Sequence, residues 1–279
     1  MHKELNSGSM KKFIISILAL ILVFPQNSFA WGRRGHDAVA AIAEANLNPK
    51  TKKILENALG GYSIIRYSAW MDDSRMLPAY AYTTKAHIFY VDDDNDYTPL
   101  LGSNFAEGEY KADAVCELLN RIEMAKNYKE LDDSTLAVTI KMIVHLVGDI
   151  HCPSHIYYKD QVHAPYSLKC SYFNPKVNTK YHTIWDDYLF DNVHKWGYME
   201  FVHQLDRLSK KEVAELVKGT PVDWAKENAA NCRFIYDVVD LNNAAVNKEL
   251  AFHTLVPLAD SQVQKAGYRL AAVLNSLFK

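Results

Sequence analysis

The sequence predicts an all-α protein, a single-domain helical bundle that spans residues 31–279. Four segments carry apolar residues at spacings of three and four, as helices facing a hydrophobic core do. They are 110–126, 134–150, 222–238 and 258–278. No internal repeat, low-complexity stretch or linker follows residue 30, and the length fits one large domain.

Helix starts are marked by capping residues at several points of the chain. Asn48 and Pro49 predict a start as N-cap and first-turn proline, and Gly60-Gly61 predicts the end of that helix. Two further starts have the spacing of a capping box: Ser209 with Glu212, and Thr220-Pro221 with Asp223.

Two regions depart from the helical pattern. The segment from His87 to Asp94 is the best candidate for an extended piece, and a loop is predicted over 95–108. Residues 156–180 are irregular, polar and aromatic, so we predict a long loop there. Loops of that length inside a compact domain are commonly functional, and this one lies between two His–Asp pairs.

The first thirty residues have the features of a cleavable secretory signal. Lys11 and Lys12 precede an apolar run over 13–24, and the small residues of Ser28-Phe29-Ala30 fit a cleavage site. The run is too short to span a bilayer comfortably, and no cysteine follows it to carry a lipid. We therefore expect a signal peptide over 1–30, a mature domain over 31–279, no membrane anchor, and a secreted or periplasmic protein.

Charge and cysteine content limit the kinds of site that the chain can form. The net formal charge is −2, so a nucleic-acid substrate would bind at a local site rather than through a broad basic surface. In an oxidising compartment one or two disulfides are plausible, with three possible pairings. No cysteines have the CxxC spacing of a thiolate zinc site; they are Cys116, Cys152, Cys170 and Cys232.

Paired histidines and aspartates carry the chemical signal. His145 and Asp149 are four residues apart in a predicted helix, so they share one face. His155 follows just beyond that helix, and His182 and Asp186 repeat the spacing of four. Imidazole and carboxylate are the ligands suited to zinc where thiolates are absent.

The simpler interpretation of one such pair is a hydrogen-bonded surface or capping pair. Asp149, however, lies in the very apolar stretch 143–150, where a carboxylate without partners is costly to bury. For one pair alone the simpler interpretation is preferred. The two pairs together favour a metal site.

Further anchors appear in a fixed order along the chain. They are Trp31-Gly-Arg-Arg-Gly-His36, Ala69-Trp70-Met71-Asp72-Asp73-Ser74-Arg75, His87, His145-x3-Asp149-x5-His155 and His182-x2-Trp185-Asp186. In this the chain resembles the zinc-dependent S1/P1 nuclease family of secreted single-strand nucleases. The resemblance covers residues 31 to about 190, and beyond it the chain agrees only in being helical.

The resemblance implies an all-α fold with three zinc ions in a cleft. Four residues would hold the first ion: Asp72, His87, His145 and Asp149. Three would hold the second: His155, His182 and Asp186. The third would be held by the amine and carbonyl of Trp31, by His36, and by Asp149 as a bridge.

The activity implied is hydrolysis of single-stranded DNA or RNA to products with a 5′-phosphate, and activity on 3′-nucleotides is left open. Asp72 would lie beside the attacking water, which zinc acidifies, and Arg75 would stabilise charge on the transition state. A surface arginine is the alternative for Arg75. The expected partners are the nucleic acid or nucleotide alone, with a monomeric protein and no stable protein partner.

The expected base pocket departs from the family's pattern. In fungal members an aromatic residue follows the histidine that corresponds to His87, and an Asp lies three residues after it. Ile88 and Tyr90 hold those places here. Phe89 and Asp92 are the candidate substrate-binding residues if the segment is shifted, with core packing the alternative for Phe89. Cys152 stands where the family commonly has Gln.

Two other functions are considered. A zinc-dependent phospholipase C has a similar fold and N-terminal Trp, but its last ligand pair typically ends in Glu rather than in a residue like Asp186. The second is a binding protein that keeps zinc without turnover, which the complete ligand set and Arg75 disfavour. The remaining histidines are expected to be structural or surface groups: His151, His163, His194, His203 and His253.

Overall fold

The computed structural model describes residues 31–98, 113–158, 169–172, 178–235, 245–246 and 251–279. The expected signal peptide therefore lies outside the described residues, as do most of the predicted loop 95–108 and His163. Among the described residues, none of the helices is both long and apolar enough to cross a membrane.

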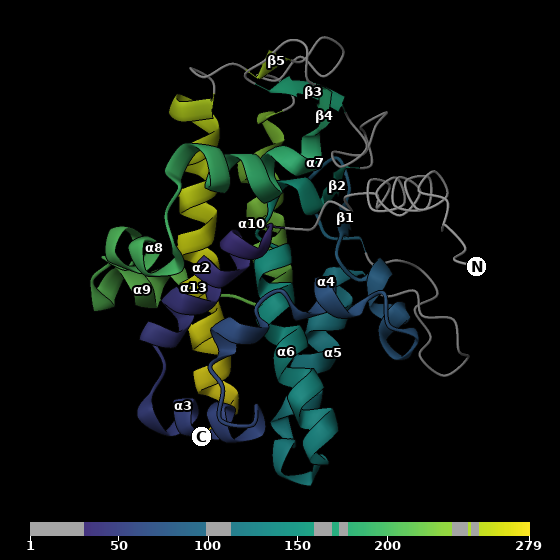
Figure 1. The fold of residues 1–279 in the computed structure, drawn as a ribbon, viewed down its shortest axis with the longest axis vertical. Coiled ribbons are helices and arrows are strands. Elements are labelled where there is room, and N and C mark those ends of the chain that lie inside the picture. The colour runs from purple at the N-terminus through teal and green to yellow at the C-terminus, as the bar shows by residue number, and fades with distance from the viewer. Residues whose placement is uncertain (1–30, 99–112, 159–168, 173–177, 236–244, 247–250) are drawn as a thin grey trace, which may run out of the picture.

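Helices dominate the fold, as predicted (Figure 1). The α-helices are α2 (Arg33–Ala45), α3 (Pro49–Ala58), α4 (Trp70–Ser74), α5 (Ala114–Lys126), α6 (Asp133–Asp149), α7 (Tyr181–Thr183), α8 (Tyr198–Leu205), α9 (Lys210–Leu216), α10 (Pro221–Arg233) and α13 (Val256–Leu277). Short 3-10 helices are η1 (Ile64–Tyr67), η2 (Pro78–Lys85), η4 (Tyr128–Glu130) and η5 (Pro153–His155). Two segments are π-helical: η7 (Ile184–His194) and η8 (Ala251–Leu255).

The capping residues act largely as expected. Ser209 with Glu212 and Thr220 with Asp223 both form complete capping boxes at the starts of α9 and α10. Asn48 occupies the N-cap position of α3, but its side chain makes no cap hydrogen bond. Its backbone N–H instead donates to Asn275 Oδ1 at 2.8 Å, which ties α3 to the last helix.

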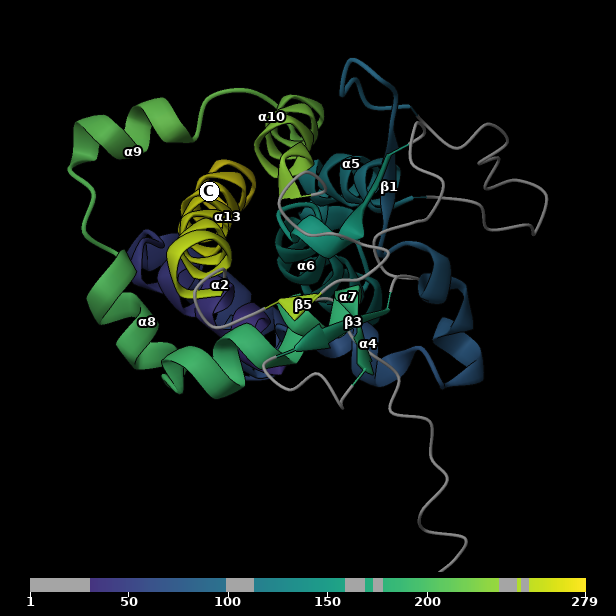
Figure 2. The same cartoon turned by 90° about the horizontal axis from the view of Figure 1, so that it is seen from above.

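Helix α6 lies at the centre of the bundle (Figures 1 and 2). Its first turn is capped by Asp132, whose side chain accepts from the Thr135 backbone. Its C-terminal half is buried on every side, as an almost entirely apolar helix requires. Helix α13 packs along α2, and Gly267 permits the contact because a Cβ there would lie 2.5 Å from Ile42 Cγ2.

Short strands correct the expectation of an irregular loop over 156–180. β1 (Phe89–Val91) pairs in parallel with β2 (Ile156–Tyr158), in the register Phe89↔Ile156. β3 (Lys169–Tyr172) pairs antiparallel with β4 (Asn178–Lys180) and parallel with β5 (Ala245–Val246). Strands of two to four residues are too short to leave the alternating pattern by which a strand is recognised.

The cysteines do not form two disulfides. The thiols of Cys152 and Cys232 are both free and buried. The side chain of Cys170 lies outside the described residues, so the expectation of a single disulfide stays a prediction.

Candidate metal centre

The last turns of α6 carry the centre of the site. His145 and Asp149 are both fully buried and lie one helical turn apart, with His145 Nε2 3.3 Å from Asp149 Oδ2. His145 Nδ1 donates to the carbonyl of Ser68 at 2.8 Å. A carbonyl that holds one ring nitrogen of histidine leaves the other directed at a metal, the usual arrangement around zinc.

Asp72 and His87 complete a first group around this pair. Helix α4 supplies Asp72, whose carboxylate oxygens lie 3.9 Å from His145 Nε2 and 4.0 Å from His87 Nδ1. His87 precedes β1, and its Nδ1 lies 3.0 Å from Asp149 Oδ2. The structure therefore brings together all four residues predicted for the first ion, although they come from three separate parts of the chain.

A second group forms where β2 begins and η7 starts. One ligand atom each from Cys152, His155 and Asp186 lies within 4.8 Å of the others, and all three residues are buried. His182 Nε2 is 2.8 Å from Asp186 Oδ2, and its ring stacks on that of His155 with centroids 5.1 Å apart. The three predicted residues meet, and Cys152 joins them. Its Cys-x-x-His spacing to His155 was the available sequence signal.

The parallel register of β1 and β2 joins the two groups. His155 precedes β2 and His87 precedes β1, and His155 Nδ1 donates to the His87 carbonyl. As at His145, this hydrogen bond leaves Nε2 directed into the site. That nitrogen is buried without a hydrogen-bond partner among the described residues.

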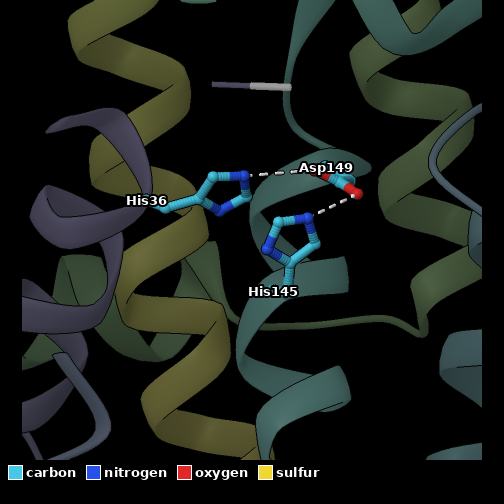
Figure 3. A group of neighbouring side chains, drawn as sticks. All are labelled: His36, His145 and Asp149. Carbon is cyan, nitrogen blue, oxygen red and sulfur yellow. Dashed lines mark ion pairs between the residues drawn. The ribbon is translucent and has the colours of Figure 1, made fainter. Parts of the chain in front are cut away.

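His36 and Asp149 form a third group with His145 (Figure 3). His36 Nε2 lies 3.4 Å from Asp149 Oδ1, so the two carboxylate oxygens face different imidazoles. Trp31, just before α2, is fully buried, and its indole nitrogen donates to the Gly148 carbonyl at 2.9 Å. This anchors the start of α2 against the end of α6.

Buried polar atoms in these groups lack the hydrogen bonds that burial normally demands. Within the described part of the chain, no hydrogen-bond partner is found for either nitrogen of His36, either carboxylate oxygen of Asp72, or His87 Nε2. Orphaned donors and acceptors are costly unless a group that the protein binds satisfies them. Orphaned polar atoms on neighbouring imidazoles and carboxylates are what a metal-binding site is expected to show.

The spacing of the donor atoms fits zinc. Zinc–ligand bonds of about 2.0–2.1 Å in a tetrahedral site place neighbouring donors about 3.4 Å apart. The observed separations are 3.3 Å from His145 Nε2 to His87 Nδ1, 3.3 Å to Asp149 Oδ2, and 3.4 Å from His36 Nε2 to Asp149 Oδ1. The donor set is nitrogen and oxygen with one sulfur, all of which zinc accepts.

Comparison with known proteins gives the family. The sequence model described as S1/P1 Nuclease matches residues 31–279. The chain belongs to the S1/P1 nuclease family. The match extends to the last residue, which corrects the expectation that the resemblance ends near residue 190. Members of this family depend on zinc, and the three groups described above are candidate sites for it.

Similar proteins are known from plants and fungi. Endonuclease 3 from Arabidopsis thaliana is 24% identical, covering 97% of this chain and 96% of its own. Nuclease S1 from Aspergillus oryzae is 24% identical over 94% of this chain and 96% of its own. Nuclease P1 from Penicillium citrinum is 20% identical over 88% of this chain and 97% of its own.

Opposing charges and burial set the protonation of the metal-free site. Burial lowers the pKa of His36 and of His155 to about 3, so both imidazoles are neutral at neutral pH. Burial also acts to lower the pKa of His145, but Asp149 and Asp72 outweigh it and raise that pKa to about 9. Burial raises the pKa of Asp72 to about 6.

Arg75 lies at the C-terminal end of α4, three residues after Asp72. It is half-buried, and its backbone N–H donates to the Met71 carbonyl at 3.1 Å. Helix α4 therefore fixes the backbone positions of both Asp72 and Arg75. The role of the Arg75 guanidinium in charge stabilisation stays a prediction.

The two candidate substrate-binding residues have structural contacts in this fold. Phe89 is fully buried in the core, which favours the packing alternative over stacking on a base. Asp92 Oδ1 accepts from the backbone of Asp94 at 3.0 Å and of Asp96 at 2.9 Å, closing the turn after β1. Arg233 Nη2 donates to the Asp92 carbonyl at 3.0 Å, tying this turn to α10.

The other described histidines lie outside the three groups. His151 is buried, with Nδ1 donating to the Val147 carbonyl and Nε2 accepting from Arg269 Nη1 at 3.0 Å. His194 pairs with Asp260 at 2.7 Å. His203 and His253 are exposed. These observations agree with the structural and surface roles expected for them.

Proposed function

We propose that this protein is a secreted zinc-dependent phosphodiesterase that hydrolyses single-stranded DNA or RNA to products carrying a 5′-phosphate, and 3′-nucleotides to a nucleoside and phosphate. One observation carries the proposal: buried imidazole and carboxylate groups converge at zinc-ligand spacing in a chain of the S1/P1 nuclease family. The relatives are named as nucleases and endonucleases. A signal peptide over 1–30 and a monomeric mature domain complete the proposal.

We assign three zinc ions to the site. The first would be held by Asp72, His87, His145 and Asp149. The second would be held by His155, His182 and Asp186, and the third by Trp31, His36 and Asp149. Two facts support Asp149 as a bridge: its oxygens face different imidazoles, and His145 and His155 hold its pKa well below the ordinary value although burial acts to raise it.

When bound, zinc acidifies a water molecule and neutralises negative charge on the phosphate. Asp72 would lie beside that water and would accept its proton at a carboxylate oxygen. The hydrogen bonds from His145 to Ser68 and from His155 to His87 fix the ring orientations. Arg75 would donate to a phosphate oxygen as negative charge accumulates there.

Asp186 and the family match favour the nuclease over a phospholipase C. Processed protein beginning at Trp31 should cleave single-stranded DNA and RNA, leave phosphatidylcholine intact and lose activity when a chelator removes zinc. Hydrolysis of phosphatidylcholine alone would favour the phospholipase. Zinc binding without hydrolysis of any phosphate ester would favour the non-catalytic binding protein.

A further inference from the structure

Aromatic rings and cations alternate along one side of the molecule. Arg66 Cζ lies 4.2 Å from the ring centre of Tyr62 and 6.0 Å from that of Tyr67. Lys141 Nζ then lies 4.4 Å from the ring centre of Tyr67 and 5.3 Å from that of Trp70. We call these five residues, Tyr62, Arg66, Tyr67, Lys141 and Trp70, the aromatic–cation row. Cation–aromatic contacts occur about once per 70–80 residues, so four on neighbouring side chains are a marked concentration.

The row is open to solvent at one end and its charges are not cancelled. Tyr62 is 49% exposed and Arg66 is also exposed, while Tyr67, Trp70 and Lys141 are half-buried. Among the described residues, neither cation has a carboxylate within ion-pair distance. Both therefore keep their charge available to an anion from outside.

A hollow of about 590 Å³ adjoins the exposed end of the row. Arg66 lines it from η1 and Tyr62 from just before η1; Arg33 and Asp37 line it from α2, and Tyr198 lines it from α8. Tyr198 is 44% exposed, which gives the hollow a second accessible ring. A space of this size holds a nucleotide-sized group.

The carboxylates at the hollow are already engaged. Of the two carboxylates that line it, Asp37 accepts from Ser68 Oγ at 2.5 Å, and Glu44 pairs with Lys52 at 3.7 Å. The hollow therefore does not have to repel an anion with a free carboxylate from these two residues. Arg33 is paired with Asp73, so Arg66 is the cation of the hollow that has no ion-pair partner among the described residues.

The row also lies next to the metal centre along the chain. Lys141 is one helical turn before His145 in α6, and Trp70 is two residues before Asp72 in α4. Ser68, which directly follows Tyr67, holds His145 through its carbonyl. The same backbone segments thus carry the row on one side and position metal ligands on the other.

We propose that the aromatic–cation row and the adjoining hollow bind a single strand of nucleic acid outside the metal centre, so that a long substrate is held at several nucleotides. This rests on the function proposed above. Aromatic faces stack on bases of any sequence, and cations at intervals meet the phosphates between them. Because the net charge of the chain is −2, the aromatic–cation row supplies a local attraction for phosphates that the overall electrostatic field of the protein does not.

The test compares a 20-nucleotide single strand with a dinucleotide, using zinc-loaded processed protein. Tyr62→Ala/Arg66→Ala should raise KM for the strand at least about fivefold, because one lost base stack alone has that effect. KM and kcat for the dinucleotide should not change. The dependence of log KM on log salt should weaken by about 0.7 for the lost cation.

Two further variants separate strand binding at the aromatic–cation row from general effects of mutation. Tyr62→Phe should behave as the wild type, since stacking needs the ring and not the hydroxyl. Lys129→Ala removes another cation that lies near a tyrosine, 5.7 Å from the Tyr128 ring, and should leave both substrates unaffected.

Each remaining outcome has one meaning. Unchanged KM and salt dependence for the strand in Tyr62→Ala/Arg66→Ala would overturn the proposal that the aromatic–cation row binds the strand, and would leave the proposed nuclease function standing. Equal losses on strand and dinucleotide would also overturn it, as they would show a general disturbance. If the wild type binds a labelled strand in a Tyr62- and Arg66-dependent way but cleaves nothing, the proposed function fails, whereas strand binding by the aromatic–cation row is supported.

Discussion

His36 stacks on His145, with ring centroids 4.0 Å apart and planes inclined by only 17°, although the two residues belong to different helices. Asp149 reaches both rings, with Oδ1 directed at His36 and Oδ2 at His145. Two neutral or positive rings held face to face with one carboxylate make sense as neighbouring metal ligands. The arrangement is the one that the proposed bridging role of Asp149 between two ions requires.

Replacing the shared carboxylate should therefore remove more than one ion. We expect Asp149→Asn to lose more than one zinc per chain and at least about 10²-fold in kcat/KM, since loss even of groups behind the ligands costs 10–100-fold. Elemental analysis and a strand-cleavage assay measure both. His253→Ala, which removes an exposed histidine, is the control. Loss of a single ion in Asp149→Asn would exclude the bridging role.

Gly148 keeps room for His36 beside α6. A Cβ at this position would lie 2.8 Å from His36 Nδ1 and 3.0 Å from its Cε1, closer than side chains pack. Gly148→Ala should therefore displace His36, reduce the zinc content by about one ion and leave the circular dichroism spectrum unchanged.

Gly60→Ala is the matched control for that change. Gly60 has φ +69 but open space around it, so alanine there adds backbone strain of about 1–2 kcal/mol without touching the site. It should lower the melting temperature and keep all of the zinc. If Gly148→Ala keeps its zinc as well, the close approach of α2 and α6 is not what places His36.

The sequence alone predicts only some of the residues that the structure brings together in the metal centre. The pairs His145/Asp149 and His182/Asp186 are recognisable because a spacing of four puts two side chains on one helical face. His36 and Asp72 have no such partner nearby in sequence. His36 reaches the centre because α2 starts beside Gly148, which makes room for its ring, and Asp72 reaches it through the position of α4. Both depend on contacts between distant segments, so only the resemblance to the family indicates them.

The same reasoning explains the errors in the fold. Long amphipathic helices such as α6 and α13 were predicted to within about two residues, because their apolar spacing repeats over several turns. The parallel pairing of β1 with β2 joins residues 89 and 156 and leaves no local signal. The sequence shows only the Cys-x-x-His spacing of Cys152 to His155, and the closeness of Cys152 to Asp186 depends on the turn after α6.

Zinc binding should release protons, because two ligands of the first group take up a proton at different pH values in the metal-free protein. His145, with a pKa of about 9, is protonated at pH 7, whereas Asp72, with a pKa of about 6, is mostly ionised. From about pH 6 to 9 one proton must leave, so affinity should rise about tenfold per pH unit; below about pH 6 the dependence should approach a hundredfold. Chelator competition across this range measures it, and a flat affinity above pH 6 would contradict the assignment.

Arg75 should contribute to turnover and not to metal binding. If its guanidinium stabilises charge on the phosphate, Arg75→Ala should lower kcat by roughly 10²–10³-fold with an unchanged zinc content. Arg207→Ala is the control, since it removes an exposed arginine that lies outside the three metal-site groups and the hollow. A kcat equal to that of the wild type would make Arg75 a surface residue.

Removal of residues 1–30 should complete the third zinc site. An amine binds zinc only when it is free and unprotonated, and Trp31 has one only after cleavage between Ala30 and Trp31. The surroundings already hold this end in place: Trp31 is fully buried, and the Gly32 N–H donates to the Asp186 carbonyl at 2.8 Å. Protein that keeps residues 1–30 should therefore contain about one zinc fewer and be much less active than protein beginning at Trp31. Mass spectrometry identifies the first residue of each form, and zinc counting with a cleavage assay compares them. Equal zinc content and equal turnover in the two forms would show that the Trp31 amine is not a ligand.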